Sequence, residues 1–337
     1  MGYGLKRFTL CCALSALIFI PATTTWAATV KVAAHLSAPV AVRGSQANDF
    51  PGTEPRQSAA QVGQLPRTVR FQEVRGRGLL VSVWVNGSGP YTFAVDTGAG
   101  ATIISRRVAG EARIVESGKR PVMMGGLSGA GSVAGHEATV RTLAVGDQQN
   151  YLPSKGLIII TERLAPGVDG VLDPVEAYWP LGFEMDMVRG DISAFDARQL
   201  PIRRAPNLPP DVAIVSWLMD GQSRRPFVML GGGKRALLDT GSEFGLAVTE
   251  DAARVLGIAP GRGRDRGDVR DLAGGSIQAH RLSPSTIRIG ELVLRGIPTD
   301  LLLNARAGSP VLLGRDALRP FRLAFDPLNR LIRIVPG

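Results

Sequence analysis

YTFAVDTGA, residues Tyr91–Ala99, is the most informative stretch of the chain, because its tripeptide Asp-Thr-Gly occurs again behind a second apolar run. The second copy is RALLDTGS, residues Arg235–Ser242, and its aspartate, Asp239, lies 143 residues after Asp96. Burying a carboxylate at the end of a strand costs free energy, because the carboxylate is removed from water. Two equivalent copies therefore indicate that both carboxylates serve the same function. The pattern predicts two similar halves that bring their aspartates face to face.

The similarity of the halves extends well beyond the tripeptides. GSVAGH (131–136) and GSIQAH (275–280) each end on a histidine, 40 and 41 residues after the respective aspartate. The halves then close with similar segments, Phe183–Asp186 and Phe321–Asp326. Self-similarity at one large period predicts a duplicated domain rather than a short-period repeat.

These residues resemble a bacterial retropepsin-like aspartic protease of the pepsin and retropepsin clan, with two tandem lobes in one chain. The resemblance implies an all-β fold. It consists of two β-barrel lobes related by a pseudo-twofold axis, with a cleft between them. It covers roughly residues 75 to 337.

Local patterns agree with mostly-β lobes. In lobe 1, a strand at 79–85 and a glycine-rich turn lead into the strand at 91–95. In lobe 2, a strand at 214–219 and the turn signal Asp220-Gly221 lead to a strand at 227–230. Both lobes are thus expected to open with strand, turn and strand before Asp-Thr-Gly. The best helix candidate is 249–257, with Thr249 as its N-cap.

The resemblance implies that Asp96 and Asp239 are the catalytic pair. Two adjacent carboxyl groups share one proton, and together they activate a water for peptide-bond hydrolysis without a metal, a cofactor or a covalent intermediate. In the family, threonine hydroxyls bond the opposite lobe, glycines permit the sharp turn, and a following hydroxyl supports the aspartate. The matching residues are Thr97, Gly98, Thr240, Gly241 and Ser242. Ala99 matches Ser242 but has no hydroxyl, which predicts two unequal acids.

Two further segments bear on the site. Gly125, Gly126 and Gly129 fall where the family has its mobile flap, and a plain surface loop is the alternative. Asp173 stands where the family pattern expects a glycine, which lobe 2 has as Gly314. An insertion at 174–181 follows Asp173, and the departure predicts altered packing behind Asp96.

The repeat-related His136 and His280 suggest a metal site at first sight. With His35 they are the three histidines of the chain, and no carboxylate ligands can be placed beside them. We therefore expect structural histidines in equivalent hairpins, and no metal.

The N-terminal segment has the pattern of a secretory signal. Lys6 and Arg7 precede an apolar run at 8–20, and small residues lead to a cleavage site before Ala28. An uncleaved N-terminal anchor is the alternative. The expected organisation is a signal peptide at 1–27, a flexible linker or prosegment at 28–70, lobe 1 at 71–200, a connector at 201–211 and lobe 2 at 212–337.

Composition limits the partners. The net charge is +10, but the arginines are scattered and no nucleic-acid recognition motif is present. We expect an exported, periplasmic or secreted monomer that acts on a peptide or protein, without nucleic acid and without stable membrane insertion after signal cleavage. The sequence thus predicts an aspartic endopeptidase. The alternative is a catalytically silent peptide- or envelope-binding protein that kept the fold.

Overall fold

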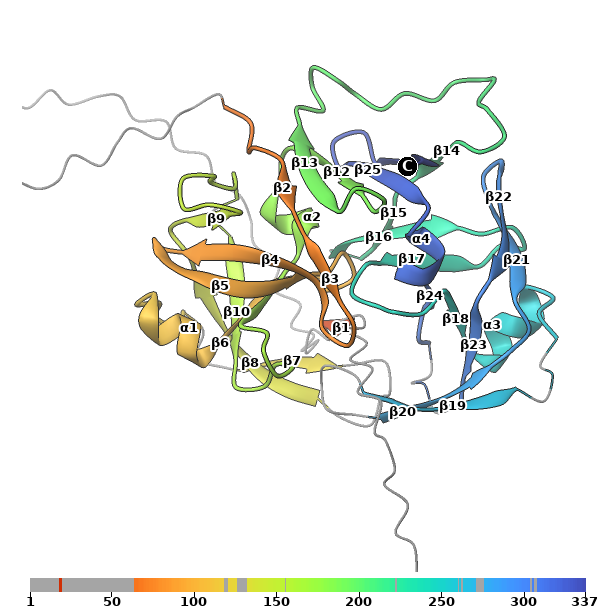
Figure 1. Ribbon diagram of the computed structural model, residues 1–337, viewed down its shortest axis with the longest axis horizontal. Helices are drawn as coiled ribbons and strands as arrows, with labels where there is room; N and C mark the ends of the chain where they lie inside the picture. The colour runs from red at the N-terminus through yellow and green to blue at the C-terminus, as the bar shows by residue number, and fades with distance from the viewer. Residues whose placement is uncertain are drawn as a thin grey trace, which may run out of the picture. The chain divides into compact units, whose positions relative to one another are not determined.

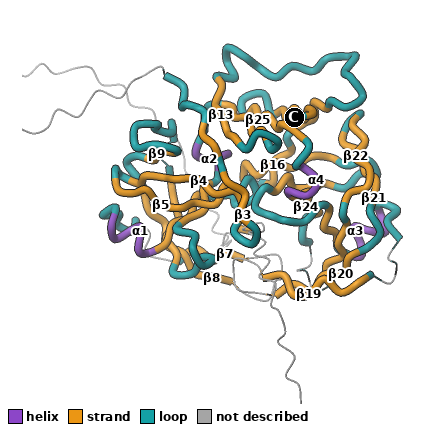
Figure 2. The backbone as a smooth tube through the Cα atoms, viewed as in Figure 1, coloured by secondary structure: helices purple, strands orange, loops and turns teal. Residues whose placement is uncertain are grey.

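The computed structural model describes Ile18–Phe19 and residues 64–117, 121–125, 132–154, 156–221, 223–259, 261, 263–270, 276–303, 305 and 308–337. Strands dominate these residues and the helices are short, as Figure 2 shows. The expected all-β class is confirmed. The expected signal peptide, apart from Ile18–Phe19, and nearly all of the expected linker lie outside the described residues.

Lobe 1 is built on one long sheet. Its described strands are β1 (Ile18–Phe19), β3 (Gln72–Val74), β4 (Gly78–Val85), β5 (Ser88–Val95), β6 (Thr102–Ser105), β7 (Val122–Gly125), β8 (Ser132–Thr139), β9 (Leu143–Val145), β10 (Leu157–Thr161) and β11 (Gly170–Leu172). The order across the sheet is β1-β7-β8-β10-β6-β11-β5-β4-β3, with β9 attached to β4. Strand β5 carries Asp96 at its end and pairs in parallel with β11.

Lobe 2 has a sheet of the same plan. Its described strands are β15 (Leu218–Asp220), β16 (Ser223–Met229), β17 (Arg235–Asp239), β18 (Leu246–Val248), β19 (Arg264–Arg270), β20 (Ser276–Arg281), β23 (Thr299–Leu302) and β24 (Val311–Gly314). The order is β15-β16-β17-β24-β18-β23-β20-β19, and β21 (Ser285–Ile289) and β22 (Leu292–Ile297) form a separate hairpin.

The two sheets match strand by strand. The order β4-β5-β11-β6-β10-β8-β7 in lobe 1 corresponds to β16-β17-β24-β18-β23-β20-β19 in lobe 2. The parallel pairs also correspond, because β5 with β11 and β6 with β10 match β17 with β24 and β18 with β23. The duplication predicted from the sequence is confirmed at the level of topology.

A third sheet contains strands from both lobes and joins them. Its described strands are β2 (Val69–Arg70), β12 (Gly182–Asp186), β13 (Asp191–Phe195), β14 (Ala213–Ser216), β25 (Phe321–Asp326) and β26 (Leu331–Pro336), in the order β14-β26-β25-β12-β13-β2. The closing segments of the two halves pair with each other, with Phe183 opposite Phe325. Figure 1 shows this sheet between the orange-to-green strands of lobe 1 and the cyan-to-blue strands of lobe 2.

Short helices occupy equivalent places in the two lobes. The described helices are α1 (Arg106–Glu111), α2 (Pro174–Ala177), α3 (Glu250–Val255) and α4 (Arg315–Leu318). Helix α3 confirms the expected helix, and the Thr249 side chain caps it by accepting a hydrogen bond from Ala252 N. Helices α2 and α4 directly follow β11 and β24, so both begin beside an Asp-Thr-Gly loop.

Two expected boundaries differ from the structure. Val69–Arg70, expected at the end of the flexible segment, form β2 and pair with β13. The expected strand at 214–219 is divided into β14, in the joining sheet, and β15, which pairs with β16. Asp220-Gly221 turns a hairpin as expected, between β15 and β16, and a second hairpin, which turns at 231–234, leads into Asp239. Gly232 and Gly233 there have φ values of 90° and 80°, which favour glycine.

The apolar core continues from the lobes into the joining sheet. Phe183, Phe325 and Trp217 are buried there, and the ring centroids of Phe183 and Phe325 lie 4.6 Å apart. Burial of these rings contributes strongly to holding the two lobes together. None of the described helices has the length and apolar character needed to cross a membrane.

Candidate active site

The two Asp-Thr-Gly loops begin where buried strands end. Asp96 directly follows β5, Asp239 is the last residue of β17, and 2% and 0% of their surfaces are exposed. The Asp96 N–H donates to the carbonyl of Leu172 at 3.0 Å, and Asp239 lies opposite Gly314. Parallel pairing of β5 with β11 and of β17 with β24 therefore fixes the position at which each Asp-Thr-Gly loop begins.

Thr97 and Thr240 interlock the loops. The Thr97 N–H donates to the Thr240 hydroxyl, and the Thr240 N–H donates to the Thr97 hydroxyl, each at 3.1 Å. The hydroxyls donate in turn to the carbonyls of Leu238 and Val95, at 2.7 and 3.3 Å. The expected threonine contacts across the lobes are confirmed, and they make the site one rigid unit.

The glycines bring backbone donors to the carboxylates. Gly98 N–H donates to Asp96 Oδ1 at 2.7 Å, and Gly241 N–H donates to Asp239 Oδ1 at 2.9 Å. A Cβ atom on Gly98 would lie 2.9 Å from Asp239 Cγ, closer than side chains pack. Only glycine therefore lets the loop of lobe 1 approach the acid of lobe 2 this closely.

Ser242 supports Asp239 differently from the expectation. Its backbone N–H donates to Asp239 Oδ1 at 3.1 Å, while its hydroxyl accepts a hydrogen bond from Phe244 N–H at 3.2 Å. The hydroxyl thus orders the turn after the loop. The predicted inequality of the acids is present in the backbone donors, since two N–H groups reach Asp239 Oδ1 and one reaches Asp96 Oδ1.

Burial and proximity raise the proton affinity of both acids. Burial, then the nearby charge of Asp239, raises the pKa of Asp96 well above its ordinary value. Burial also raises the pKa of Asp239 to about 6, while a hydrogen bond with Asp96 and the charge of Arg315 oppose the rise. Two buried carboxyl groups that lie close together resist ionising at the same time, so the pair keeps a proton to higher pH than a free carboxyl group does.

A buried arginine supports the loop of lobe 2 and was missed by the sequence reasoning. Arg315 is 0% exposed, and its Nη1 donates to the carbonyl of Thr240 at 2.7 Å. Its guanidinium also lies 3.2 Å from Glu243 and 3.3 Å from Glu73. The signal was present in the sequence as an arginine directly after the buried run Val311–Gly314.

Lobe 1 is altered after Asp173, but its active-site strand keeps its place. Strand β11 pairs with β5 as β24 pairs with β17, so the expected disturbance behind Asp96 is absent at the strand. Asp173 is 1% exposed and caps α2 by accepting a hydrogen bond from Val175 N at 2.9 Å. Its own N–H donates to the Thr102 hydroxyl at 3.2 Å, whereas Gly314 N–H donates to the carbonyl of Gly245.

The other candidate residues lie away from the pair or outside the described residues. Gly125 ends β7, and Gly126 and Gly129 fall outside the described residues. His136 in β8 lies 3.2 Å from Glu116, and His280 in β20 pairs with Asp265 and Leu301. Within the described ranges, no cluster of three or more His, Cys, Asp or Glu side chains is arranged to hold a metal.

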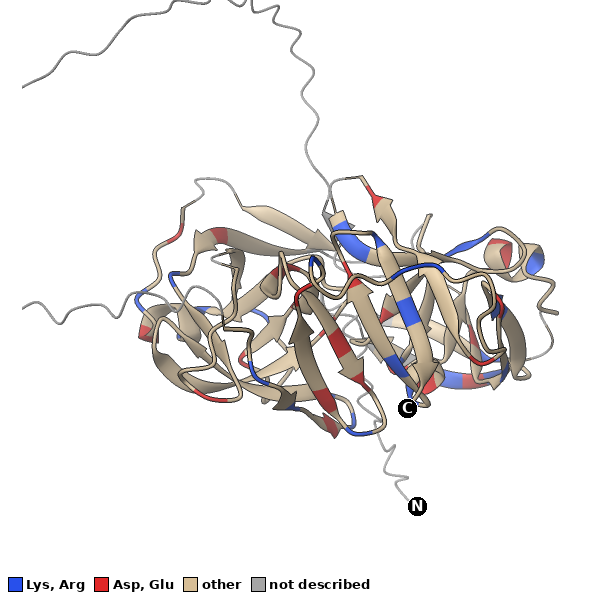
Figure 3. Cartoon of the chain, turned by 90° about the horizontal axis from the view of Figure 1, so that it is seen from above, with Lys and Arg blue, Asp and Glu red and all other residues tan. Residues whose placement is uncertain are grey.

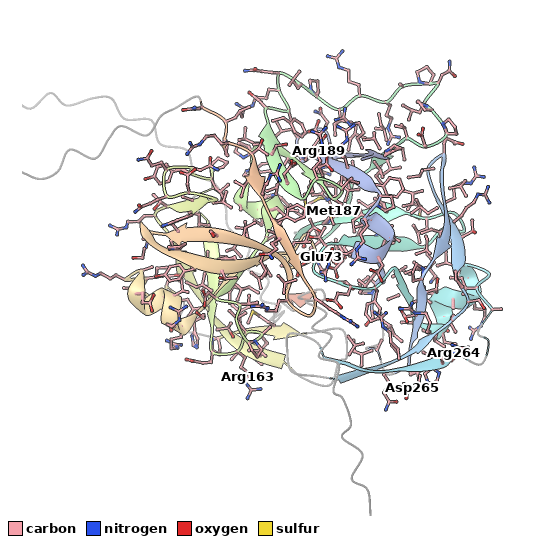
Figure 4. All side chains as sticks on the ribbon, in the orientation of Figure 1. Glu73, Arg163, Met187, Arg189, Arg264 and Asp265 are labelled. Atoms are coloured by element: carbon pink, nitrogen blue, oxygen red, sulfur yellow. The ribbon has the colours of Figure 1, made fainter. Side chains whose placement is uncertain are left out.

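A cavity of about 430 Å³ opens beside the loop of lobe 2. It is lined by charged side chains from β3 and its turn, the loop after Ser242, β19 and α4: Glu73, Arg75, Glu243, Arg266, Asp316 and Arg319. Figure 4 labels Glu73 of β3, whose carboxylate bridges Arg315 and Arg319. The cavity is lined by charged groups of both signs, and neither aspartate is among its lining residues.

Comparisons with known proteins agree with this geometry. A sequence model of the family described as aspartyl protease matches residues 81–172 and 229–317, one match for each Asp-Thr-Gly loop. Among solved structures, the fold is similar to the crystal structure of an aspartic proteinase from Irpex lacteus. The TM-score is 0.51 and the sequence identity 15%, over 80% of this chain and 97% of that one. No curated protein matches the sequence. Because the two family matches together cover more than half of the chain, this protein belongs to the aspartyl protease family.

Proposed function

We propose that this protein is an aspartic endopeptidase in which Asp96 and Asp239 activate one water molecule for peptide-bond hydrolysis. The observation that carries the proposal is the meeting of two buried carboxyl groups from equivalent loops, locked together by Thr97 and Thr240. Burying two acids side by side destabilises the folded protein. Catalysis accounts for the arrangement, because a pair that shares one proton contains both a general base and a general acid.

In the proposed reaction, the ionised aspartate takes a proton from the water as the water oxygen attacks the scissile carbonyl carbon. The protonated aspartate donates its proton to the carbonyl oxygen, which gives a tetrahedral diol. The first aspartate then gives the proton it took to the leaving nitrogen, and the C–N bond breaks. The second aspartate recovers its proton from a diol hydroxyl, so the pair returns to its starting state.

The substrate proposed is an extended peptide. Strand β7 ends at Gly125, beside the segment that matches the flap in sequence, and one of its edges pairs with Ile18–Phe19 of the expected signal peptide. In the mature chain, an extended peptide would take that edge and gain the same kind of backbone hydrogen bonds. The charged cavity beside Glu243 would receive a neighbouring side chain of the substrate.

The catalytically silent binding protein is the weaker candidate. Altered packing behind Asp96 would favour it, but the strand before Asp173 keeps its register with β5. The Thr97 and Thr240 contacts, which a binding module does not need, are complete.

We also propose that the enzyme is exported and works as a monomer, since one chain supplies both aspartates. In the view of Figure 3, Lys and Arg are interspersed with Asp and Glu over both lobes, a distribution that does not favour a nucleic-acid site.

The test is incubation of the mature chain, beginning at Ala28, with a mixed peptide library at pH 3 to 8, with products identified by mass spectrometry. We expect cleavage at internal bonds that persists in the presence of a metal chelator and of reagents that block serine and cysteine nucleophiles. Cleavage that the chelator abolishes contradicts the mechanism. Retention of peptides without any cleavage, on the same chain immobilised, would favour the binding protein.

A further inference from the structure

The charged cavity beside the loop of lobe 2 has walls from both lobes. Glu73 and Arg75 come from β3 and the turn after it, in lobe 1, and the other lining residues belong to lobe 2. Among these, Glu243 directly follows Ser242, and Arg266 comes from β19, which holds in lobe 2 the place that β7 holds in lobe 1. The volume of 430 Å³ lies within the range of about 300–1,000 Å³ that is usual for ligand pockets, so a side chain of a bound peptide has room to enter.

The turn that contains Arg75 is fixed against lobe 2 on both sides. The Glu73 carboxylate lies 3.3 and 2.7 Å from two arginines of lobe 2. The Gly76 N–H donates to a carboxylate oxygen of Glu243 at 2.6 Å. Arg75 lies between these two anchors in the chain, so its backbone is held at the cavity wall while its side chain is exposed.

Each carboxylate of the cavity wall already has an arginine partner. Glu73 and Glu243 lie 3.3 and 3.2 Å from the buried Arg315. Asp316 lies 3.5 Å from Arg319, which also pairs with Glu73. None of the lining acids is therefore left to attract a basic side chain from a ligand.

The arginines around the cavity are in excess over the acids. Arg266 is bonded to Asp300, a fully buried acid that also pairs with Arg281 at 2.8 Å. With these two residues and Arg315, the cluster contains five arginines and four carboxylates. Arg75 is the one arginine of the cluster that has no ion pair among the residues that the structure describes. A cation at the mouth of a partly enclosed site attracts an anion more strongly than it does in open water.

We infer that this cavity selects an acidic side chain, Asp or Glu, of the peptide substrate, and that the Arg75 guanidinium pairs with its carboxylate. Arg315 joins the cavity to the catalytic loop, because it bonds the carbonyl of Thr240 as well as two acids of the wall. The selected side chain therefore belongs to a residue near the scissile bond. The inference rests on the proposed function for its substrate, but selection of the acidic side chain is a matter of binding and needs no cleavage.

The experiment compares Arg75→Gln with Arg77→Gln. Arg77 is a matched control, because it lies in the same turn, is also exposed and does not line the cavity, and its guanidinium lies beside Gly167 of lobe 1. Both variants lose one positive charge, so an effect of net charge alone is equal in the two. Arg75→Glu reverses the charge at the cavity. The peptide library is cleaved at about pH 5.5, where peptide Asp and Glu side chains, with pKa values of about 3.9 and 4.3, are ionised.

We expect the parent to cleave peptides in which Asp or Glu is enriched at one position near the scissile bond. For two peptides that differ only there, the Glu peptide should have a kcat/KM about fivefold above that of the Gln peptide, through KM, as an exposed ion pair allows. Arg75→Gln removes this difference, Arg77→Gln keeps it, and Arg75→Glu favours a Lys peptide instead. Cleavage without acidic enrichment, or a preference that survives in Arg75→Gln, overturns the inference.

A binding measurement separates the inference from the proposed function. The same library is passed over immobilised Asp96→Asn and over immobilised Asp96→Asn with Arg75→Gln, and the retained peptides are identified by mass spectrometry. We expect acidic residues to be enriched on the first chain and not on the second. Equal enrichment on both chains overturns the inference. A parent that never cleaves but shows this dependence on Arg75 supports the inference and refutes the proposed function.

Discussion

Replacing Thr97 by valine tests how the lobes are locked. Valine has the shape of threonine, so Thr97→Val creates no cavity but removes a hydroxyl that is fully buried. Two groups lose their partner: the carbonyl of Leu238, bonded at 2.7 Å, and the N–H of Thr240, bonded at 3.1 Å. A buried polar group left unpaired costs about 1–3 kcal/mol, so the free energy of unfolding should fall by roughly 2–6 kcal/mol.

The assay is urea unfolding followed by tryptophan fluorescence, to which Trp217 contributes from its buried place against Phe325 where the lobes join. Thr97→Ser is the control, because it keeps both hydrogen bonds and loses one methyl group, at about 1 kcal/mol. We also expect Thr240→Val to cost less than Thr97→Val, since its hydroxyl donates at 3.3 Å. If the free energies of unfolding of Thr97→Val and Thr97→Ser differ by less than about 0.5 kcal/mol, the hydrogen bonds of Thr97 do not hold the lobes together.

Two further predictions follow from the same loops. Gly98→Ala places a Cβ atom 2.9 Å from Asp239 Cγ, so kcat should fall by about 10²-fold from the displaced carboxyl group. Gly110→Ala, with no atom within 4 Å, should leave peptide cleavage unchanged, and equal rates for the two variants would refute the geometry. The second prediction concerns pH. The folded pKa of Asp239, about 6, lies above its unfolded value of about 3.9, so its contribution to stability is complete below pH 4 and is lost as pH rises through 6. Urea unfolding should show about 3 kcal/mol more loss between pH 4 and pH 7 in the parent than in Asp239→Asn, and parallel losses would contradict the raised pKa.

The sequence was sufficient to predict the duplicated arrangement of the two lobes and the position of both Asp-Thr-Gly loops. An Asp-Thr-Gly tripeptide needs a buried strand before it and a glycine turn within it, and both copies show this locally. Thr249 and the acidic residues after it likewise predict α3 from the local sequence alone.

What the sequence did not predict depends on contacts between distant segments. Arg315 is bonded to Thr240, 75 residues away, and faces Glu73, 242 residues away. No periodicity marks such a residue. The direction of the Ser242 hydroxyl was also misjudged, because the turn brings the Phe244 N–H within 3.2 Å of it. Asp173 departs from the family pattern in sequence, and the pattern does not explain why. The structure does, because the Asp173 carboxylate caps α2 by accepting a hydrogen bond from Val175 N.

The most direct test of the account is cleavage of an unfolded protein by the mature chain, measured from acidic to neutral pH beside Asp96→Asn and Asp239→Asn. Circular dichroism of each variant establishes that it is folded. We expect the parent to cleave and both variants, still folded, to lose essentially all activity, because neither carboxyl group alone can both accept and donate the proton. A folded variant that keeps more than a few per cent of the parent activity would contradict the shared pair.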